Sequence, residues 1–79
     1  MQEIISNKVY ELRFKAGITQ EALAEAIGVT RQTIIAIEKG NYTPSVILAL
    51  RIGRFFKKPL EEIFSIKYDP SIKTRGHGE

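Results

Sequence analysis

Two adjacent polar residues, Arg31 and Gln32, have side chains whose chemistry suits the edges of nucleic-acid bases. The guanidinium of Arg31 can donate two hydrogen bonds to guanine O6 and N7, and the amide of Gln32 can pair with adenine N6 and N7. Both residues follow Thr30, whose hydroxyl is suited to capping the start of a helix. The alternative is that they are simply solvent-facing residues of an amphipathic helix.

The sequence offers few residues of the kinds that catalyse reactions or bind metals. The chain has no cysteine, which excludes disulfides, thiolate zinc sites and thiol nucleophiles. Its single histidine, His77, lies in the segment Gly76-His77-Gly78-Glu79, and no carboxylate pair or nucleophile and base spacing is present. We therefore expect no catalytic residues, no metal site, no cofactor and no enzymatic activity.

The charge distribution favours a nucleic-acid partner. The net charge is +3, and residues 28–58 contain six basic residues against a single acidic one, Glu38, while the segments on either side each carry a small acidic excess. Lys and Arg side chains bind phosphates by displacing condensed counterions, although a basic face that only meets solvent is the alternative. The chain has neither a signal-peptide pattern at its start nor the roughly 18 apolar residues of a membrane span, so we expect a cytoplasmic location.

The elements that must position Arg31 and Gln32 are about five short helices, which predicts an all-α fold with a central helix-turn-helix. Residues 1–68 are expected to form this single domain, and the composition of residues 69–79 predicts a flexible tail. The expected elements are Asn7–Ala16, a helix capped by Thr19 and ended by Gly28, a helix from Thr30 to Gly40, a helix opening at Thr43-Pro44, a last turn over residues 59–64, and a possible strand at Ser65–Tyr68.

The apolar pattern also predicts which faces are buried. In the second helix Ala22 and Ala26 are expected to be small where the third helix crosses closely, beside Leu23 and Ile27. Ile34 and Ile37 should face inward from the third helix. In the fourth helix, the expected core contacts are Val46, Leu50, and Phe55 or Phe56, and Gly53 should cost about 1 kcal/mol of helix stability.

Taken together, these segments resemble the Cro/repressor-type (XRE family) helix-turn-helix transcriptional regulators of bacteria, archaea and phages. The resemblance runs through residues 12–34, 37–40, 42–45, 48–50 and 60–64, and covers roughly residues 8–64. It implies a lambda-repressor-like fold and sequence-specific binding to double-stranded DNA, as a repressor that acts as a homodimer on a two-fold-symmetric operator. The alternative is a protein-interaction module, such as a coactivator-like protein or an antitoxin subunit, that uses the same fold.

The resemblance implies roles for individual residues. It places Gln20, Arg31 and Gln32 against DNA, and Ile35 could contact a thymine methyl group as a third base-reading side chain. The hydroxyl, amide, ammonium and backbone groups expected to contact phosphates belong to Gln20, Thr30, Lys39, Asn41 and Tyr42. Arg13 and Glu38 occupy positions where similar proteins have an ion pair that ties the first helix to the end of the third.

The C-terminal third contains more apolar side chains than so small a domain can bury on one side, which predicts a homodimer. Phe64, Ile66 and Tyr68 are the expected interface residues, and the strand Ser65–Tyr68 could pair with a second copy across a two-fold axis. Such a dimer would place two DNA-binding helices about 34 Å apart on one face of B-DNA. No ligand cavity is evident, so no small-molecule partner is expected.

Overall fold

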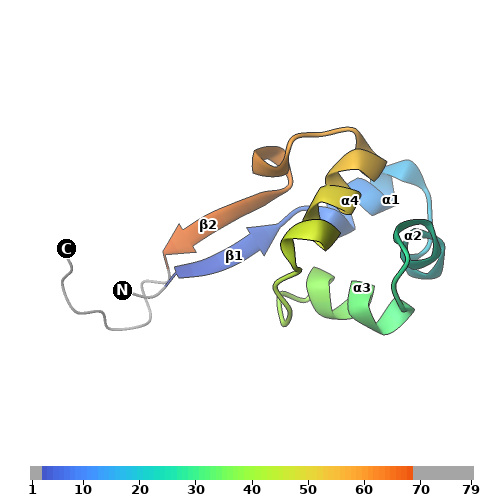
Figure 1. Cartoon of the computed structure of the whole chain (residues 1–79), viewed down its shortest axis with the longest axis horizontal. Helices are drawn as coiled ribbons and strands as arrows, with labels where there is room; N and C mark the ends of the chain where they lie inside the picture. Colours follow the sequence, from blue (N-terminus) through green and yellow to red (C-terminus); the bar gives the residue numbers. More distant parts are fainter. Residues whose placement is uncertain (1–2, 69–79) are drawn as a thin grey trace.

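The computed structural model describes residues 3–68, which form four α-helices, one 3₁₀ turn and a two-stranded antiparallel sheet (Figure 1). The elements are β1 (Glu3–Asn7), α1 (Val9–Ala16), α2 (Gln20–Ile27), α3 (Arg31–Glu38), α4 (Val46–Phe56), η1 (Leu60–Glu62) and β2 (Phe64–Tyr68). The predominantly helical fold with a central helix-turn-helix confirms the predicted class. The expected last turn over residues 59–64 is the 3₁₀ turn η1, so the α-helices number four where about five were expected. The predicted tail at residues 69–79 lies outside the described residues.

The strand pair extends away from the helices as an arm (Figure 1). The possible C-terminal strand is present as β2, and it pairs with β1, a strand that the sequence analysis did not predict. The register places Asn7 opposite Phe64 and Glu3 opposite Tyr68. One edge of β2 is therefore paired within the same chain, and pairing of this strand with a second copy stays a prediction.

Hydroxyl side chains start three of the helices. Thr19 accepts a hydrogen bond from the Ala22 amide and Thr30 from the Thr33 amide, which confirms both predicted caps. The prediction for α4 was wrong. Ser45, two residues after Thr43, caps this helix and accepts from the Leu48 amide at 3.2 Å. Because the helix begins at Val46, the Ser45 hydroxyl is the one placed to accept from an amide of its first turn, and Thr43 and Pro44 precede the helix.

The helices enclose one core, made of Val9, Leu23, Ala24, Ile27, Ile34, Ile37, Leu48, Ile52 and Ile63. The predicted faces of two helices need correction. Ala22 and Ala26 are exposed and Ala24 is the buried alanine of α2. In α4, Val46 and Leu50 are 76% and 54% exposed, because the alternative stripe of Leu48 and Ile52, also four residues apart, faces inward.

Gly53 has a packing role that its helix propensity does not reveal. It is buried in α4, and a Cβ atom at this position would lie 3.1 Å from both Leu60 Cδ2 and the Lys58 carbonyl oxygen. The missing side chain therefore lets η1 approach α4 closely. This contact offsets part of the helix cost expected from glycine.

Candidate nucleic-acid interface

The turn between α2 and α3 sets the direction of α3. Gly28 ends α2 with a φ of +80°, which favours glycine, and Arg51 donates a hydrogen bond from Nη1 to the Ile27 carbonyl at 3.3 Å. Ile34 and Ile37 are fully buried and anchor α3 to the core that contains α2. The outward face of α3 is thereby fixed by the burial of its inward face.

The three predicted base-reading residues differ in exposure. Arg31 and Gln32 lie exposed in the first turn of α3, where the helix begins, whereas Ile35 is half-buried one turn later. An α-helix that enters a major groove contacts base edges with its N-terminal residues. The two side chains with paired hydrogen-bonding capacity are therefore free of the protein core at the end of the helix that would reach the bases.

The predicted phosphate contacts mostly surround α3. Thr30 lies before its first residue and Lys39, Asn41 and Tyr42 follow its last, and all four are exposed. The Thr30 hydroxyl is already engaged, because it accepts from the Thr33 amide and lies 3.1 Å from the Thr33 hydroxyl. These positions bracket both ends of α3, which suits contacts to the backbone on either side of a groove.

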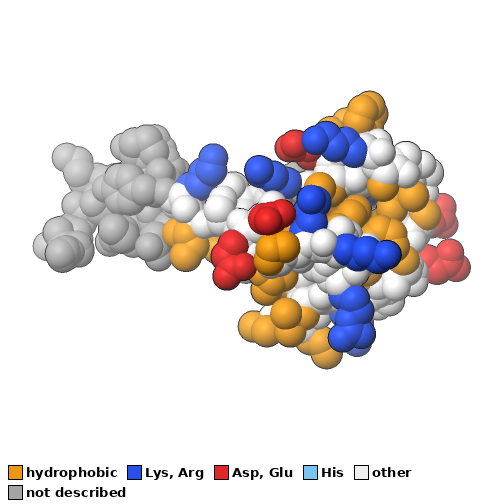
Figure 2. Space-filling model, turned by 90° about the horizontal axis from the view of Figure 1, so that it is seen from above, with side chains coloured by type: hydrophobic (Ala, Val, Ile, Leu, Met, Phe, Trp, Pro, Cys, Tyr) orange, Lys and Arg blue, Asp and Glu red, His pale blue; other side chains and the backbone are white. Residues whose placement is uncertain are grey.

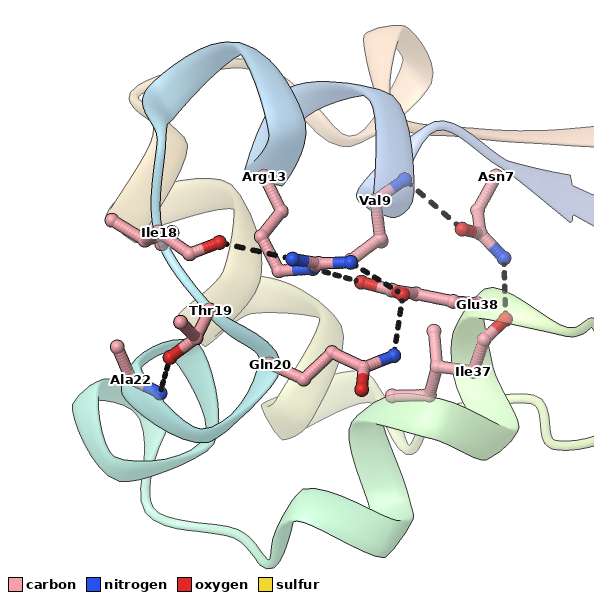
Figure 3. A network of polar contacts seen from close by, with 9 residues as sticks. All are labelled: Asn7, Val9, Arg13, Ile18, Thr19, Gln20, Ala22, Ile37 and Glu38. Atoms are coloured by element: carbon pink, nitrogen blue, oxygen red, sulfur yellow. Dashed lines mark hydrogen bonds and ion pairs between the residues drawn. The ribbon is translucent and has the colours of Figure 1, made fainter.

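The structure brings Arg13 and Glu38 together between α1 and α3 (Figure 3). Arg13 Nε donates to Glu38 Oε2 at 2.6 Å and Arg13 Nη2 donates to Oε1 at 3.2 Å. The Arg13 and Glu38 side chains are only 12% and 6% exposed. The hydrogen bond to Glu38 raises the pKa of Arg13 above its ordinary value, against the opposing effect of burial. This bidentate pair joins α1 to the last residue of α3.

Two further groups complete this network. Arg13 Nη1 donates to the Ile18 carbonyl at 2.9 Å, and Gln20 Nε2 donates to Glu38 Oε1 at 3.1 Å (Figure 3). Gln20 was expected to contact DNA, and the structure also gives it a partner inside the protein. An amide nitrogen carries two hydrogens, so one remains available for a phosphate oxygen.

Asn7 forms a second connection to α3, which the sequence analysis missed. Its Nδ2 donates to the Ile37 carbonyl and its Oδ1 accepts from the Val9 amide, each at 3.0 Å (Figure 3). An asparagine just before a helical pattern is a typical local cap, and this signal identifies the second bond. The bond to Ile37 spans thirty positions, so no local pattern predicts it.

The basic residues of segment 28–58 divide between two parts of the surface. Arg31 and Lys39 lie at the two ends of α3, while Arg51, Arg54, Lys57 and Lys58 belong to α4 or directly follow it. Figure 2 shows Lys and Arg side chains interleaved with hydrophobic and acidic ones on the side of the molecule opposite α3. The positive charge that clusters in the sequence is therefore not confined to the surface of α3.

A largely apolar surface is formed by α4 and the strand pair, and we call it the α4–strand surface. Its exposed members include Val46, Ile47, Leu50 and Ile66. It also contains a groove lined by Ile5, Thr43, Pro44, Val46, Ala49, Leu60, Glu61 and Phe64. Of the predicted dimer residues, Phe64 packs partly against the core and Ile66 is 65% exposed, while the backbone of Tyr68 pairs with Glu3.

Residues 3–68 contain neither a metal-binding cluster nor a membrane-spanning helix. In that range no three His, Cys, Asp or Glu side chains gather as they would around a metal ion. None of the helices described there is long and apolar enough to cross a membrane.

Known proteins resemble this chain across the same region. The helix-turn-helix family model matches residues 9–63. An HTH-type transcriptional regulator of Methanothermobacter thermautotrophicus is 55% identical over 62 residues, which are 77% of this chain and 90% of that protein. An HTH-type transcriptional regulator of Bacillus subtilis is 53% identical over 60 residues, or 76% and 91%. The transcriptional repressor of the cryptic phage CTXphi of Vibrio cholerae is 32% identical over 75 residues, or 91% and 68%.

The matched region includes all four α-helices and the polar network that holds α3. A family model that spans most of the chain and relatives above half identity agree with the geometry of α2 and α3. This chain belongs to the XRE-type helix-turn-helix family and is a DNA-binding transcriptional regulator.

Proposed function

We propose that the protein is a cytoplasmic transcriptional repressor that binds a two-fold-symmetric operator as a homodimer. The observation that carries this proposal is the first turn of α3, where Arg31 and Gln32 are exposed while the opposite end of the helix is held by Arg13, Gln20 and Asn7. The repressor role is supported by the phage CTXphi relative, which is named a transcriptional repressor.

Specificity in this proposal comes from the exposed face of α3. Arg31 donates two hydrogen bonds to a guanine and Gln32 makes a paired contact with an adenine. Ile35, half-buried on the same helix, adds contact with a thymine methyl group. Together these side chains discriminate a short half-site.

Affinity comes from contacts that do not depend on base identity. Lys39 neutralises a phosphate, and Gln20, Thr30, Asn41 and Tyr42 donate hydrogen bonds to the backbone on either side of the groove. Such contacts fix the register in which Arg31 meets the bases.

The α4–strand surface is the proposed homodimer interface. Ile5 and Ile66 are directly opposite each other in the strand pair, and Phe64 is two residues from Ile66 on the same face of the sheet. That face adjoins α4, since Ile5, Phe64 and Val46 line one groove. Val46 in this groove is 76% exposed, and Ile47 and Leu50 on the same helix are 59% and 54% exposed. In the proposed dimer these apolar side chains meet the same surface of a second copy about a two-fold axis, and the strand carrying Tyr68 extends the contact.

Sedimentation of the full chain and two matched variants tests the dimer. The substitution Leu50→Asp places a charge in the proposed interface, and the control Phe14→Asp changes an α1 side chain that is 70% exposed outside it. We expect the wild-type protein and Phe14→Asp to sediment as dimers and Leu50→Asp as a folded monomer. A wild-type protein that remains monomeric at high micromolar concentration would contradict the proposed homodimer.

Selection of bound fragments from random DNA, at a stated salt concentration, tests operator binding. We expect an enriched motif with two-fold symmetry. The absence of any enriched motif at moderate salt would instead favour the protein-interaction module.

A further inference from the structure

We propose that Asn7 is a positioning residue that fixes the angle between the strand pair and α3, and thereby the half-site spacing that the dimer accepts. The inference rests on the proposed dimeric function, because spacing has meaning only for two linked copies of α3. Asn7 itself would contact neither DNA nor the second copy.

The two hydrogen bonds of Asn7 join three elements. The residue ends β1, its Oδ1 accepts from the first amide of α1, and its Nδ2 donates to the Ile37 carbonyl in the last turn of α3. The same carbonyl also accepts from the Gly40 amide at 3.0 Å. Both lone pairs of this oxygen are thus occupied, which restrains the end of α3 in direction as well as position.

Asn7 also lies where the strand pair joins the helical body. It is opposite Phe64 in the strand register, and the adjacent Lys8 amide donates to the Ile63 carbonyl at 2.9 Å. Ile63 is buried in the core. The strand pair forms part of the α4–strand surface, so Asn7 links the proposed dimer interface directly to the DNA-binding helix.

A small change in this angle has a large effect at the DNA. α3 has eight residues, which at the α-helical rise gives a length of about 12 Å. Pivoting it by about 10° at its C-terminal end moves its N-terminal end by roughly 2 Å. In a symmetric dimer the two displacements sum to about one base-pair step, which is 3.4 Å along B-DNA.

Two substitutions separate the roles of the two hydrogen bonds. Asn7→Asp keeps an oxygen for the Val9 amide, at the positive end of α1, but replaces the donor to Ile37 with an oxygen that repels the carbonyl. Asn7→Ala removes both bonds. The control is Ser6→Ala, which removes the exposed 3.0 Å hydrogen bond between Ser6 and Ser65 from the same strand pair.

Two measurements are made on each full-length protein. The first is amide hydrogen exchange of Gly40 and Asn41, whose amides close the last turn of α3. The second is affinity for the selected operator and for versions whose half-sites are moved one base pair closer together or further apart.

We expect Asn7→Asp and Asn7→Ala to exchange these amides faster than wild type and to bind the natural spacing about fivefold to fiftyfold more weakly, as loss of a partly buried hydrogen bond requires. Binding to the shifted operators should weaken much less, so the ratio of the affinity for the natural spacing to that for a shifted spacing falls towards one. Ser6→Ala should match wild type in both measurements.

Three results would overturn the inference. Unchanged exchange in both Asn7 variants would show that the side chain does not hold α3. Faster exchange with an unchanged ratio of affinities across spacings would show a purely structural role. A wild-type protein without any spacing preference would contradict the proposed dimeric function together with this extension of it, and the exchange rates would then show separately whether Asn7 restrains α3.

Discussion

At one end of α3 the polar side chains have protein partners, and at the other end they face solvent. In the C-terminal turn, the Glu38 carboxylate accepts from Arg13 and Gln20, and the Ile37 carbonyl accepts from Asn7. In the N-terminal turn, Thr30 caps the helix while the side chains of Arg31 and Gln32 remain exposed. The difference separates two tasks, since groups that orient a helix must be satisfied within the fold and groups that read DNA must be left for DNA.

The largest expected effect is a loss of stability from changes at the C-terminal end of α3. Arg13→Ala leaves the Glu38 carboxylate, whose side chain is 6% exposed, without its bidentate partner. We expect the free energy of unfolding to fall by about 3 kcal/mol, as for other broken buried ion pairs. Urea denaturation measures this, with Glu11→Ala as the control because the 3.8 Å contact between Glu11 and Lys15 is exposed. An Arg13→Ala protein as stable as the control would show that the network does not hold α3.

At the N-terminal end of α3 the opposite is expected, because substitutions there should weaken DNA binding and leave folding intact. Arg31→Ala and Gln32→Ala are each expected to weaken specific binding by about 1–3 kcal/mol. Their urea midpoints should match wild type, because both side chains are exposed. Affinities for the selected operator and for unrelated DNA check this, and a variant that keeps wild-type affinity and motif would remove that residue from the base-reading pair.

The cap of α3 should have an intermediate effect on stability. Thr30→Ala removes the acceptor for the Thr33 amide, and we expect a loss of about 1 kcal/mol. Thr43→Ala is the matched control, because Ser45 supplies the cap of α4. Equal unfolding midpoints for the two variants would be inconsistent with this assignment.

The smallest expected effect is that of Lys39, which directly follows α3 and is exposed. Lys39→Ala should weaken binding to operator and unrelated DNA about equally and reduce the slope of log affinity against log salt by roughly one unit. Titrations at several salt concentrations measure the slope, with Lys15→Ala on α1 as the control. An unchanged slope would argue against a phosphate contact by Lys39.

Local signals in the sequence predicted the helix-turn-helix well. Thr19 and Thr30 cap the helices that they were expected to cap, and Gly17 and Gly28 end helices with φ of +71° and +80°. These features depend on residues a few positions apart, where capping and glycine conformations leave a direct trace in the sequence.

Features that depend on distant partners were missed. β1 has only five residues and is stabilised by pairing with β2 at the other end of the domain, and Asn7 reaches Ile37 thirty positions away. The predicted inward face of α4 was also wrong, because the run from Val46 to Ile52 offers two apolar stripes of equal spacing. Only packing against the rest of the core, in which Leu48 and Ile52 are buried, selects between them.

The most direct test of base recognition by the first turn of α3 is a double-mutant cycle between Arg31 and the operator. Affinities are measured for wild type and Arg31→Ala against the selected operator and against operators in which each base pair is replaced in turn. We predict a coupling of about 1–3 kcal/mol at one symmetry-related guanine in each half-site and near zero elsewhere. An Arg31→Ala protein that loses the same affinity for every operator would contradict base recognition by the first turn of α3.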